Sequence, residues 1–337
     1  MKLGDISTHH IDALAAAIRA LGKDPTPLLL QYQIDDELMA NPDARISIPR
    51  LMHMGHSAIQ LTGHPELGLE MGRCANIQNL GLPGLTAMAA PDLRTAMEAI
   101  TRYEPLSSVN IRGQSSYLEQ DEALLRFYSI APYNDYNRFV VDSVLSMWSQ
   151  LLVWLSGKRD LVKRVDIEFE APHYQARYRD YFNCEPLFGQ PYNQLAISPQ
   201  LLDSPLRFSN AANFSYLSEL CEQKLAQMRR GRSLQARVAE ILASALHGNT
   251  PCIGEVAAKL AMPSWTLRRK LQDEGVTFQQ ILGETKRDLA LIYVEDTALS
   301  LGEIAYLLGF SSPEAFQRAF KRWTDRTPGD YRRQPTG

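Results

Sequence analysis

The chain has 337 residues, of which 45% are hydrophobic and 22% are charged. A chain of this length can form two domains or one large one, and this composition excludes a disordered or fibrous protein. The formal net charge of -3 at pH 7 neither indicates nor excludes a nucleic-acid partner, and the charge is unevenly distributed along the chain.

The first 205 residues mix helical and strand patterns, which predicts an α+β domain. Apolar residues at helical spacing predict helices over residues 11–21 and 92–103, and Asp92 is the expected N-cap of the second. Apolar or alternating runs predict strands over residues 124–130, 164–170 and 193–197. In residues 164–170 the strict alternation places Asp166, Glu168 and Glu170 on a solvent-facing side.

The longest apolar stretch, residues 139–155, is interrupted by Asp142 and by several serines. A membrane span requires about 20 predominantly apolar residues. We therefore expect a helix over residues 138–155 that is buried in a core or faces a partner chain, and no membrane partner. The N-terminus has neither a continuous apolar core nor a cleavage pattern, so we expect no signal peptide and a cytoplasmic location.

The pattern becomes helical and more charged over residues 206–232, which we interpret as a helical linker region. Residues 233–334 contain no convincing strand and are predicted to form an all-α domain. The predicted organisation is therefore an α+β domain over residues 1–205, the linker, and the all-α domain.

An internal repeat is the most informative feature of this last domain. Residues 253–262 match residues 301–310, with Gly254, Glu255 and Ala257 matching Gly302, Glu303 and Ala305. A short break and a second predicted helix follow each copy, over residues 265–271 and 315–322. The spacing Ser300-x-x-Glu303 and Ser311-x-x-Glu314 predicts two capping boxes, and Gly309 is expected at positive φ.

Each second helix has an apolar back and a polar front. Leu267 and Leu271 are four residues apart, as are Phe316 and Phe320, so each pair faces one side of its helix. The outward residues are cationic or polar: Arg268, Arg269 and Lys270 in the first copy, and Gln317, Arg318, Lys321 and Arg322 in the second. One such helix is more often a solvated surface, but two matching copies favour helix-turn-helix units that bind the DNA major groove.

A third capping box is predicted at Thr277 and Gln280, followed by a helix through Ile281, Leu289 and Ile292. This helix connects the two units. Reading adjacent major grooves from one face of DNA requires the two second helices to lie about 34 Å apart.

Residues 233–334 resemble the AraC/XylS family of transcription regulators, most specifically in the run 304–323 and in 327–332. The resemblance implies base contacts from Trp265, Arg268 and Arg269 in the first unit. In the second unit it places the base-contact positions at Pro313, Glu314, Gln317 and Arg318. Pro313 has no backbone N–H to donate, which argues against a contact from that residue. The first unit departs from the family's commoner Gly-Met-Ser turn, since it has Ala261, Met262, Pro263 and Ser264.

The N-terminal domain resembles the arabinose-binding-type sensor domain of a subgroup that includes ornithine-utilisation regulators. The resemblance is carried by residues 67–72, 82–85, 93–99, 182–189 and 201–206. It implies a small-molecule effector, a homodimer, and an activator that works with RNA polymerase at promoter sites in double-stranded DNA. It identifies neither the effector nor the residues of its pocket.

The sequence gives no positive evidence for an enzymatic function. Nucleophile-elbow, phosphate-loop and dinucleotide motifs are missing, so we predict no catalytic residues and no cofactor. His53, His56 and His64 could ligate a metal, but no carboxylate or cysteine clearly completes the set, so we expect surface or core roles. The four cysteines, Cys74, Cys184, Cys221 and Cys252, include no Cys-x-x-Cys pair and are expected to be free thiols. An architectural DNA-bending protein is the third alternative, disfavoured by the large α+β domain.

Overall fold

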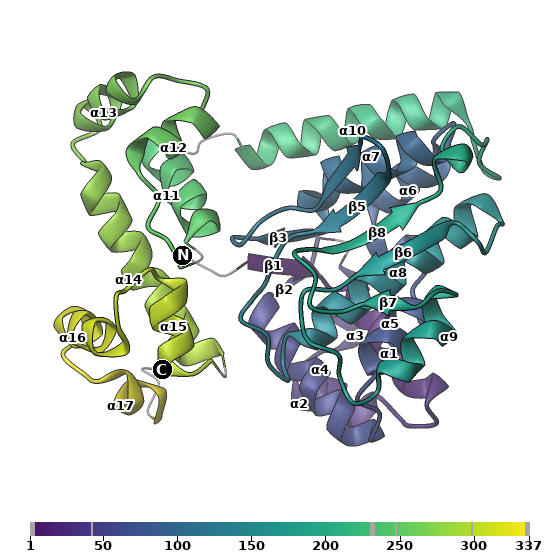
Figure 1. Cartoon of the computed structure of the whole chain (residues 1–337), viewed down its shortest axis with the longest axis horizontal. Helices are drawn as coiled ribbons and strands as arrows, with labels where there is room; N and C mark the ends of the chain where they lie inside the picture. Colours follow the sequence, from purple (N-terminus) through teal and green to yellow (C-terminus); the bar gives the residue numbers. More distant parts are fainter. Residues whose placement is uncertain (1–3, 42, 230–232, 247, 298, 334–337) are drawn as a thin grey trace. The chain divides into compact units, whose positions relative to one another are not determined.

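The computed structural model describes residues 4–41, 43–229, 233–246, 248–297 and 299–333 (Figure 1). The chain divides into two compact units. The N-terminal unit holds Asp5–Val109 and Gln114–Met228. The C-terminal unit holds the described residues from Arg229 onward, together with Gly4 and Asn110–Gly113. The predicted fold class is confirmed: the first unit mixes helices with two sheets, and the described residues from Ser233 onward form helices without strands.

A five-stranded sheet forms the centre of the N-terminal unit, with strand order β4-β5-β8-β6-β7. Its strands are β4 (Ser116–Glu119), β5 (Ala123–Phe127), β6 (Val162–Asp166), β7 (Pro186–Leu187) and β8 (Asn193–Ile197). Only β6 and β7 pair in parallel, and the other neighbours are antiparallel. Leu125, Leu195 and Val165 lie side by side across three strands and are fully buried, so they define the apolar face of the sheet.

The helix predicted over residues 138–155 is α8 (Arg138–Ser156), and it lies in the core. Val141, Leu145 and Trp148 are buried in the same apolar cluster as the sheet face. Among the described residues, α8 is the one helix long and apolar enough to cross a membrane, but 56% of its most apolar window is buried within the protein. This burial is typical of a core helix.

Two glycines let a second helix approach α8 closely. Gly68 and Gly72 lie in α5 (Leu67–Cys74), which packs along α8. A Cβ atom on Gly68 would lie 2.6 Å from the Phe139 carbonyl oxygen, and one on Gly72 would collide with Ser146. The helix-helix contact therefore excludes any side chain at these two positions.

A smaller sheet, with strand order β2-β1-β3, accompanies the remaining helices of this unit. The strands are β1 (Gly4–Ser7), β2 (Arg45–Ser47) and β3 (Ser108–Asn110). The other α-helices are α1 (His9–Ala20), α2 (Thr26–Gln31), α3 (Asp36–Ala40), α4 (Ile48–Thr62), α6 (Leu82–Ala89), α7 (Leu93–Tyr103), α9 (Tyr178–Phe182) and α10 (Ala211–Arg229). Short 3-10 helices are η1 (Ile77–Leu80), η2 (Glu104–Leu106), η3 (Gln175–Arg177) and η4 (Pro199–Leu201).

The predicted helices and strands of this unit are found, with corrections to two strand ends. The strand predicted over residues 124–130 ends at Phe127. Asp92 caps α7 as expected, because its side chain accepts a hydrogen bond from the Thr95 backbone N–H. The strand predicted over residues 164–170 instead ends at Asp166. Asp166 is buried rather than solvent-facing, because Arg164 and Gln194 donate hydrogen bonds to its carboxylate.

The predicted linker region is largely a single helix that packs on the N-terminal unit. Cys221 and Leu225 of α10 are buried against Ala99 and Tyr103 of α7. A helix that only connects two domains is exposed on all sides, whereas α10 buries apolar residues against one of them.

The C-terminal unit is built from α11 (Leu234–Ala245), α12 (Ile253–Lys259), α13 (Ser264–Asp273), α14 (Phe278–Asp296), α15 (Leu301–Leu307), α16 (Pro313–Thr324) and α17 (Pro328–Arg333). One apolar cluster runs through it, with Val238, Leu271, Leu289 and Phe316 among its buried members. The connecting helix predicted after Thr277 is α14, and Thr277 and Gln280 form the expected capping box.

A buried carboxyl group weakens the N-terminal core at neutral pH. Asp142 lies on α8 with 1% of its surface exposed, and the hydroxyls of Tyr178 and Tyr174 donate to its two oxygens at 2.6 and 3.2 Å. Burial raises the pKa of Asp142 to about 7, although the two tyrosine hydrogen bonds oppose that shift. A folded-state pKa above the unfolded value favours folding at low pH, and this contribution disappears as pH rises from about 4 to about 7.

We therefore expect Asp142→Asn to raise the unfolding free energy of the N-terminal unit at pH 8 and to flatten its dependence between pH 4 and 7. The asparagine keeps an acceptor for Tyr178 and needs no ionisation. Urea unfolding across this pH range measures both effects. Asp121→Asn, at an exposed carboxyl, is the control. An unchanged slope in Asp142→Asn would show that the buried carboxyl does not titrate as described.

Candidate nucleic-acid interface

The first repeat copy folds as a helix-turn-helix unit made of α12 and α13. The small Ala257 on α12 is buried, which lets α13 approach closely. Leu267 and Leu271 on α13 have no exposed surface. The predicted outward residues Arg268, Arg269 and Lys270 are exposed. The apolar back thus fixes which way the polar front points.

The second copy repeats this arrangement with α15 and α16. Ala305 is buried at the position that matches Ala257, and Phe316 and Phe320 on α16 have no exposed surface. Their rings lie 5.7 Å apart edge to face, and Phe320 also meets Tyr331 of α17. The predicted outward residues Glu314, Gln317, Arg318, Lys321 and Arg322 are all exposed.

Matching positions on the two helices form two equivalent exposed stripes. On α13 the stripe is Trp265, Arg268, Arg269 and Gln272, and on α16 it is Glu314, Gln317, Arg318 and Lys321. Both follow the i, i+3, i+4, i+7 spacing that keeps side chains on one helix face. Sequence reasoning missed Gln272, although its alignment with Lys321 could have revealed it. Lys270 and Arg322 are exposed beside the two stripes.

The cations of the two stripes make no ion pair or hydrogen bond with any described residue of the chain. Arg268, Arg318 and Lys321 therefore keep all their donors, while Arg269 lies with its guanidinium 5.7 Å from the ring centroid of Trp265. Trp265 itself is 65% exposed, which is unusual for so large an apolar side chain.

Other arginines of this unit are engaged in holding its fold. Arg332 donates to the carbonyl oxygens of Val294 and Leu299, and Arg333 pairs with Asp330. Burial lowers the pKa of Arg332, which fits a structural position. The chain thus separates cations that hold the fold from cations that are free to bind a polyanion.

The helix starts show one wrong prediction and one omission. Ser300 and Glu303 form the predicted capping box of α15. The second predicted box is wrong, because the N-cap of α16 is Ser312, whose hydroxyl accepts from the Ala315 N–H. Pro313 favours the first helical position, which moves the cap to the residue before it. Sequence reasoning missed Cys252, which caps α12 together with Glu255.

Glu314 lies in the first turn of α16, where a carboxylate is favoured by the helix dipole. The Ser312 side chain hydrogen-bonds to it and holds its pKa below the usual range, helped by the backbone N–H of Glu314. The group is therefore an acceptor on the exposed face at neutral pH.

Both turns require a left-handed residue after the first helix. Gly309 adopts φ +64° there, as predicted. Ala261 occupies the matching position in the first unit with φ +52°, a conformation that costs an L-residue about 1–2 kcal/mol. Alanine at a position that favours glycine therefore leaves strain in the first turn.

The loop before the first helix-turn-helix unit packs against the second helix-turn-helix unit. A Cβ atom on Gly248 would lie 2.6 Å from the Tyr306 ring, and one on Gly309 would lie 2.8 Å from the Thr250 hydroxyl. Lys286 of α14 joins the two sides: its ammonium donates to the Thr250 hydroxyl at 3.0 Å and lies 5.1 Å from the Phe310 ring centroid. Burial lowers the pKa of Lys286. These contacts, with α14, hold the two helix-turn-helix units in a fixed relation within the C-terminal unit.

The three candidate metal ligands of the N-terminal unit have other contacts. His56 stacks on Tyr136 at 4.1 Å, and His53 meets the same ring edge to face. His64 lies 3.3 Å from the Glu66 carboxylate. Among the described residues, no group of three or more histidine, cysteine, aspartate or glutamate side chains is arranged to hold a metal.

Two helix-turn-helix units with apolar backs and free cations on their fronts define a DNA-binding regulator. Comparison with known proteins gives the same class. Residues 22–206 match the arabinose-binding domain of AraC transcription regulators, and residues 256–334 match a helix-turn-helix domain. The chain therefore belongs to the AraC family of transcription regulators, and it is not an enzyme.

Similar proteins align with nearly the whole chain. The ornithine utilization regulator of Pseudomonas aeruginosa is 28% identical over 97% of this chain and 96% of its own length. The regulator VirS of Mycobacterium tuberculosis is 24% identical over 98% of each chain. Among solved structures, the transcriptional regulator CdpR from Pseudomonas aeruginosa is 22% identical, with a TM-score of 0.43, over 94% of this chain and 97% of that one.

Opposite effects are expected from exchanging glycine and alanine at the two matched turns. Ala261→Gly should raise the unfolding free energy by about 0.5–1 kcal/mol, since strain relief exceeds the entropy that glycine adds to the unfolded chain. Gly309→Ala should lower it by about 2 kcal/mol or more, because it adds both the φ penalty and a collision with Thr250. Calorimetry of the full chain measures the transition of the C-terminal unit. Equal responses at both turns would contradict the assigned conformations.

Proposed function

We propose that α13 and α16 are recognition helices that enter adjacent major grooves of a promoter site. The observation that carries this proposal is the pair of equivalent exposed stripes whose cations have no partner within the described chain. Solvation alone does not require exposed polar and cationic side chains at matching positions of both helix-turn-helix units. Helices with packed backs and free donors have the shape and chemistry that the major groove accepts.

Each stripe position has a base chemistry that suits it. Arg268 and Arg269, and Arg318 in the second unit, are suited to guanine O6 and N7, and Gln317 to adenine N6 and N7. Glu314 is suited to the cytosine amino group, and Trp265 to a thymine methyl group. Lys270, Lys321 and Arg322 are assigned to phosphates, which set the register on DNA.

We also propose that the protein is an effector-responsive activator of a metabolic operon and acts as a cytoplasmic homodimer with RNA polymerase. Support comes from the N-terminal unit, which is a separate α+β body matching an arabinose-binding domain. It comes also from a relative that is named for ornithine utilisation. A large separate α+β body favours a ligand-responsive regulator over an architectural DNA-bending protein.

The proposed DNA-binding domain comprises residues 233–334, and we expect this fragment to fold alone. It contains both units, α14 and their shared apolar cluster. It should bind operator DNA specifically but more weakly than the full chain, since the second copy of a dimer is lost. Circular dichroism and operator titration test both parts. A fragment without helical structure would place the boundary elsewhere.

Single substitutions should separate base contacts from phosphate contacts. Arg268→Ala and Gln317→Ala should each cost about 1–3 kcal/mol and relax the preference at one operator position. The two relaxed positions should lie about 10 base pairs apart. Lys321→Ala should weaken all sequences equally and reduce the salt dependence by about one unit of slope.

The measurement is titration of a randomised operator library at two salt concentrations. Arg237→Ala, at an exposed arginine on α11 outside both stripes, is the matched control. Unchanged sequence preference in both Arg268→Ala and Gln317→Ala would show that these helices do not read bases.

A further inference from the structure

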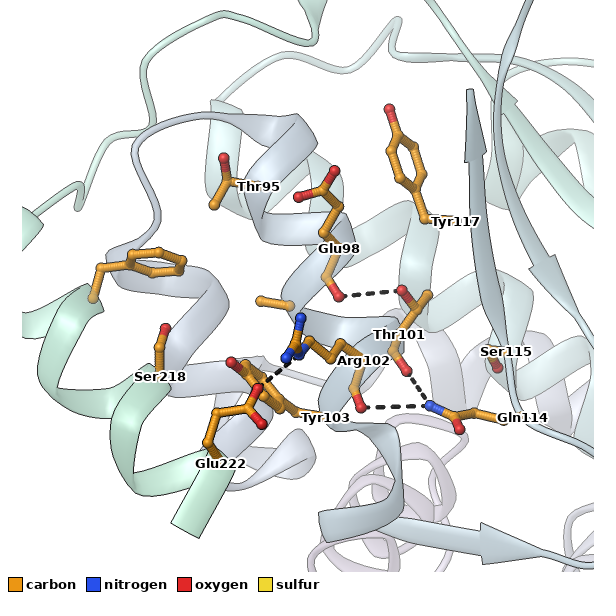
Figure 2. A pocket seen from close by; sticks show the side chains of 12 residues that line it. Thr95, Glu98, Thr101, Arg102, Tyr103, Gln114, Ser115, Tyr117, Ser218 and Glu222 are labelled. Carbon is orange, nitrogen blue, oxygen red and sulfur yellow. Dashed lines mark hydrogen bonds and ion pairs between the residues drawn. The ribbon is translucent and has the colours of Figure 1, made fainter. Parts of the chain in front are cut away.

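The N-terminal unit contains an open pocket between α7, β4 and α10. Its volume is about 970 Å³, which is at the upper end of ordinary ligand pockets. Figure 2 shows that α7 contributes Glu98 and Arg102, β4 contributes Tyr117, and α10 contributes Ser218 and Glu222. The pocket lies wholly within this unit.

Two oppositely charged side chains of α7 line the pocket without pairing with each other. Glu98 and Arg102 are four residues apart, a spacing at which such side chains commonly form an ion pair. Arg102 instead turns toward α10, where its Nε donates to Glu222 at 2.7 Å (Figure 2). Among the described residues, the Glu98 carboxylate has no cationic partner and the two Nη groups of Arg102 have no acceptor. The pocket therefore offers an unused anion and an unused double donor about one helical turn apart.

The rest of the lining suits a small organic molecule. The Tyr117 hydroxyl is engaged by Glu119, so its ring presents an apolar wall. The buried hydroxyl oxygen of Ser218 has no hydrogen-bond partner in the described part of the chain. A buried polar atom without a partner favours a ligand that supplies one.

The charges decide between ligand classes. A dicarboxylate would face the unpaired Glu98, and a simple amine would leave the Arg102 donors unused. A molecule with an ammonium group and a carboxylate satisfies both, because guanidinium groups bind carboxylates through two parallel hydrogen bonds.

We propose that this pocket binds a small zwitterionic effector of the amino-acid type, with its ammonium group at Glu98 and its carboxylate at Arg102. The proposal rests on the effector-responsive function proposed above. Bound ligand would contact α7 and α10 together, and α10 is the last helix before the DNA-binding domain in the chain. A ligand that favours one position of α10 would shift the equilibrium between regulatory states.

The test uses the full-length protein and the standard L-amino acids as probes, with thermal shift first and calorimetric titration for any probe that binds. We expect at least one amino acid to bind, and its N-acetyl and amide derivatives to bind much more weakly. Glu98→Gln and Arg102→Met should each raise Kd by about tenfold or more, since each removes a charge-assisted contact. Glu37→Gln and Arg159→Met, at exposed charges away from the pocket, are controls that should leave Kd unchanged.

Two results would overturn the site: no amino acid binds, or Kd is unchanged in both pocket variants. Circular dichroism of these variants excludes misfolding as the cause of lost binding. Operator titration with and without the bound probe separates this proposal from the one on which it rests. An effector of another class could shift operator affinity equally in the wild type and in the pocket variants. That result would contradict the proposed site and support an effector-responsive function. A probe bound as expected, with operator affinity and promoter output unchanged, would support the pocket and contradict effector response.

Discussion

The proposed DNA-binding surface depends on the burial of one apolar pair at the back of α13 and of one at the back of α16. Leu267 and Leu271, like Phe316 and Phe320, have no exposed surface. Fully burying such side chains stabilises the fold by about 1.5–3 kcal/mol each, which is more than any exposed ion pair contributes. Because the pair fixes the rotation of the helix about its axis, it also decides that the free cations point outward. The direction in which the exposed front of each helix points is thus set by packing at its back.

This arrangement explains why the two copies tolerate different residues on their fronts. Trp265 matches Glu314 and Arg268 matches Gln317. None of these side chains is buried in the apolar cluster, so they can change with little loss of stability. The backs and turns are more constrained, and even there the first unit retains Ala261 at positive φ. The matched exchange of glycine and alanine at the two turns probes that constraint directly.

Periodicity in the sequence was sufficient to predict the elements that carry function. Spacing alone placed Leu267 and Leu271 inside and Arg268 outside, because helix geometry is local. The errors arose where several rules compete or distant residues meet. Proline at the first helical position shifted the cap from Ser311 to Ser312, and cross-strand partners buried Asp166. Neither the Lys286 contact with Thr250 nor the pocket beside Glu98 has any signature in the sequence, since both join segments far apart in the chain.

The N-terminal unit retains groups that a purely structural domain would discard. Asp142 is buried at a cost near neutral pH. At the pocket, α7 presents a Glu98 carboxylate that has no cationic partner among the described residues, and an Arg102 whose Nε pairs with Glu222. Polar groups that lower the free energy of unfolding are typical of binding sites, because a bound ligand can offset that loss of stability. One wall of the pocket is α10, which also buries Cys221 and Leu225 against α7. A ligand has regulatory effect only through different affinities for two such packed states, and α10 is the element whose packing it would change.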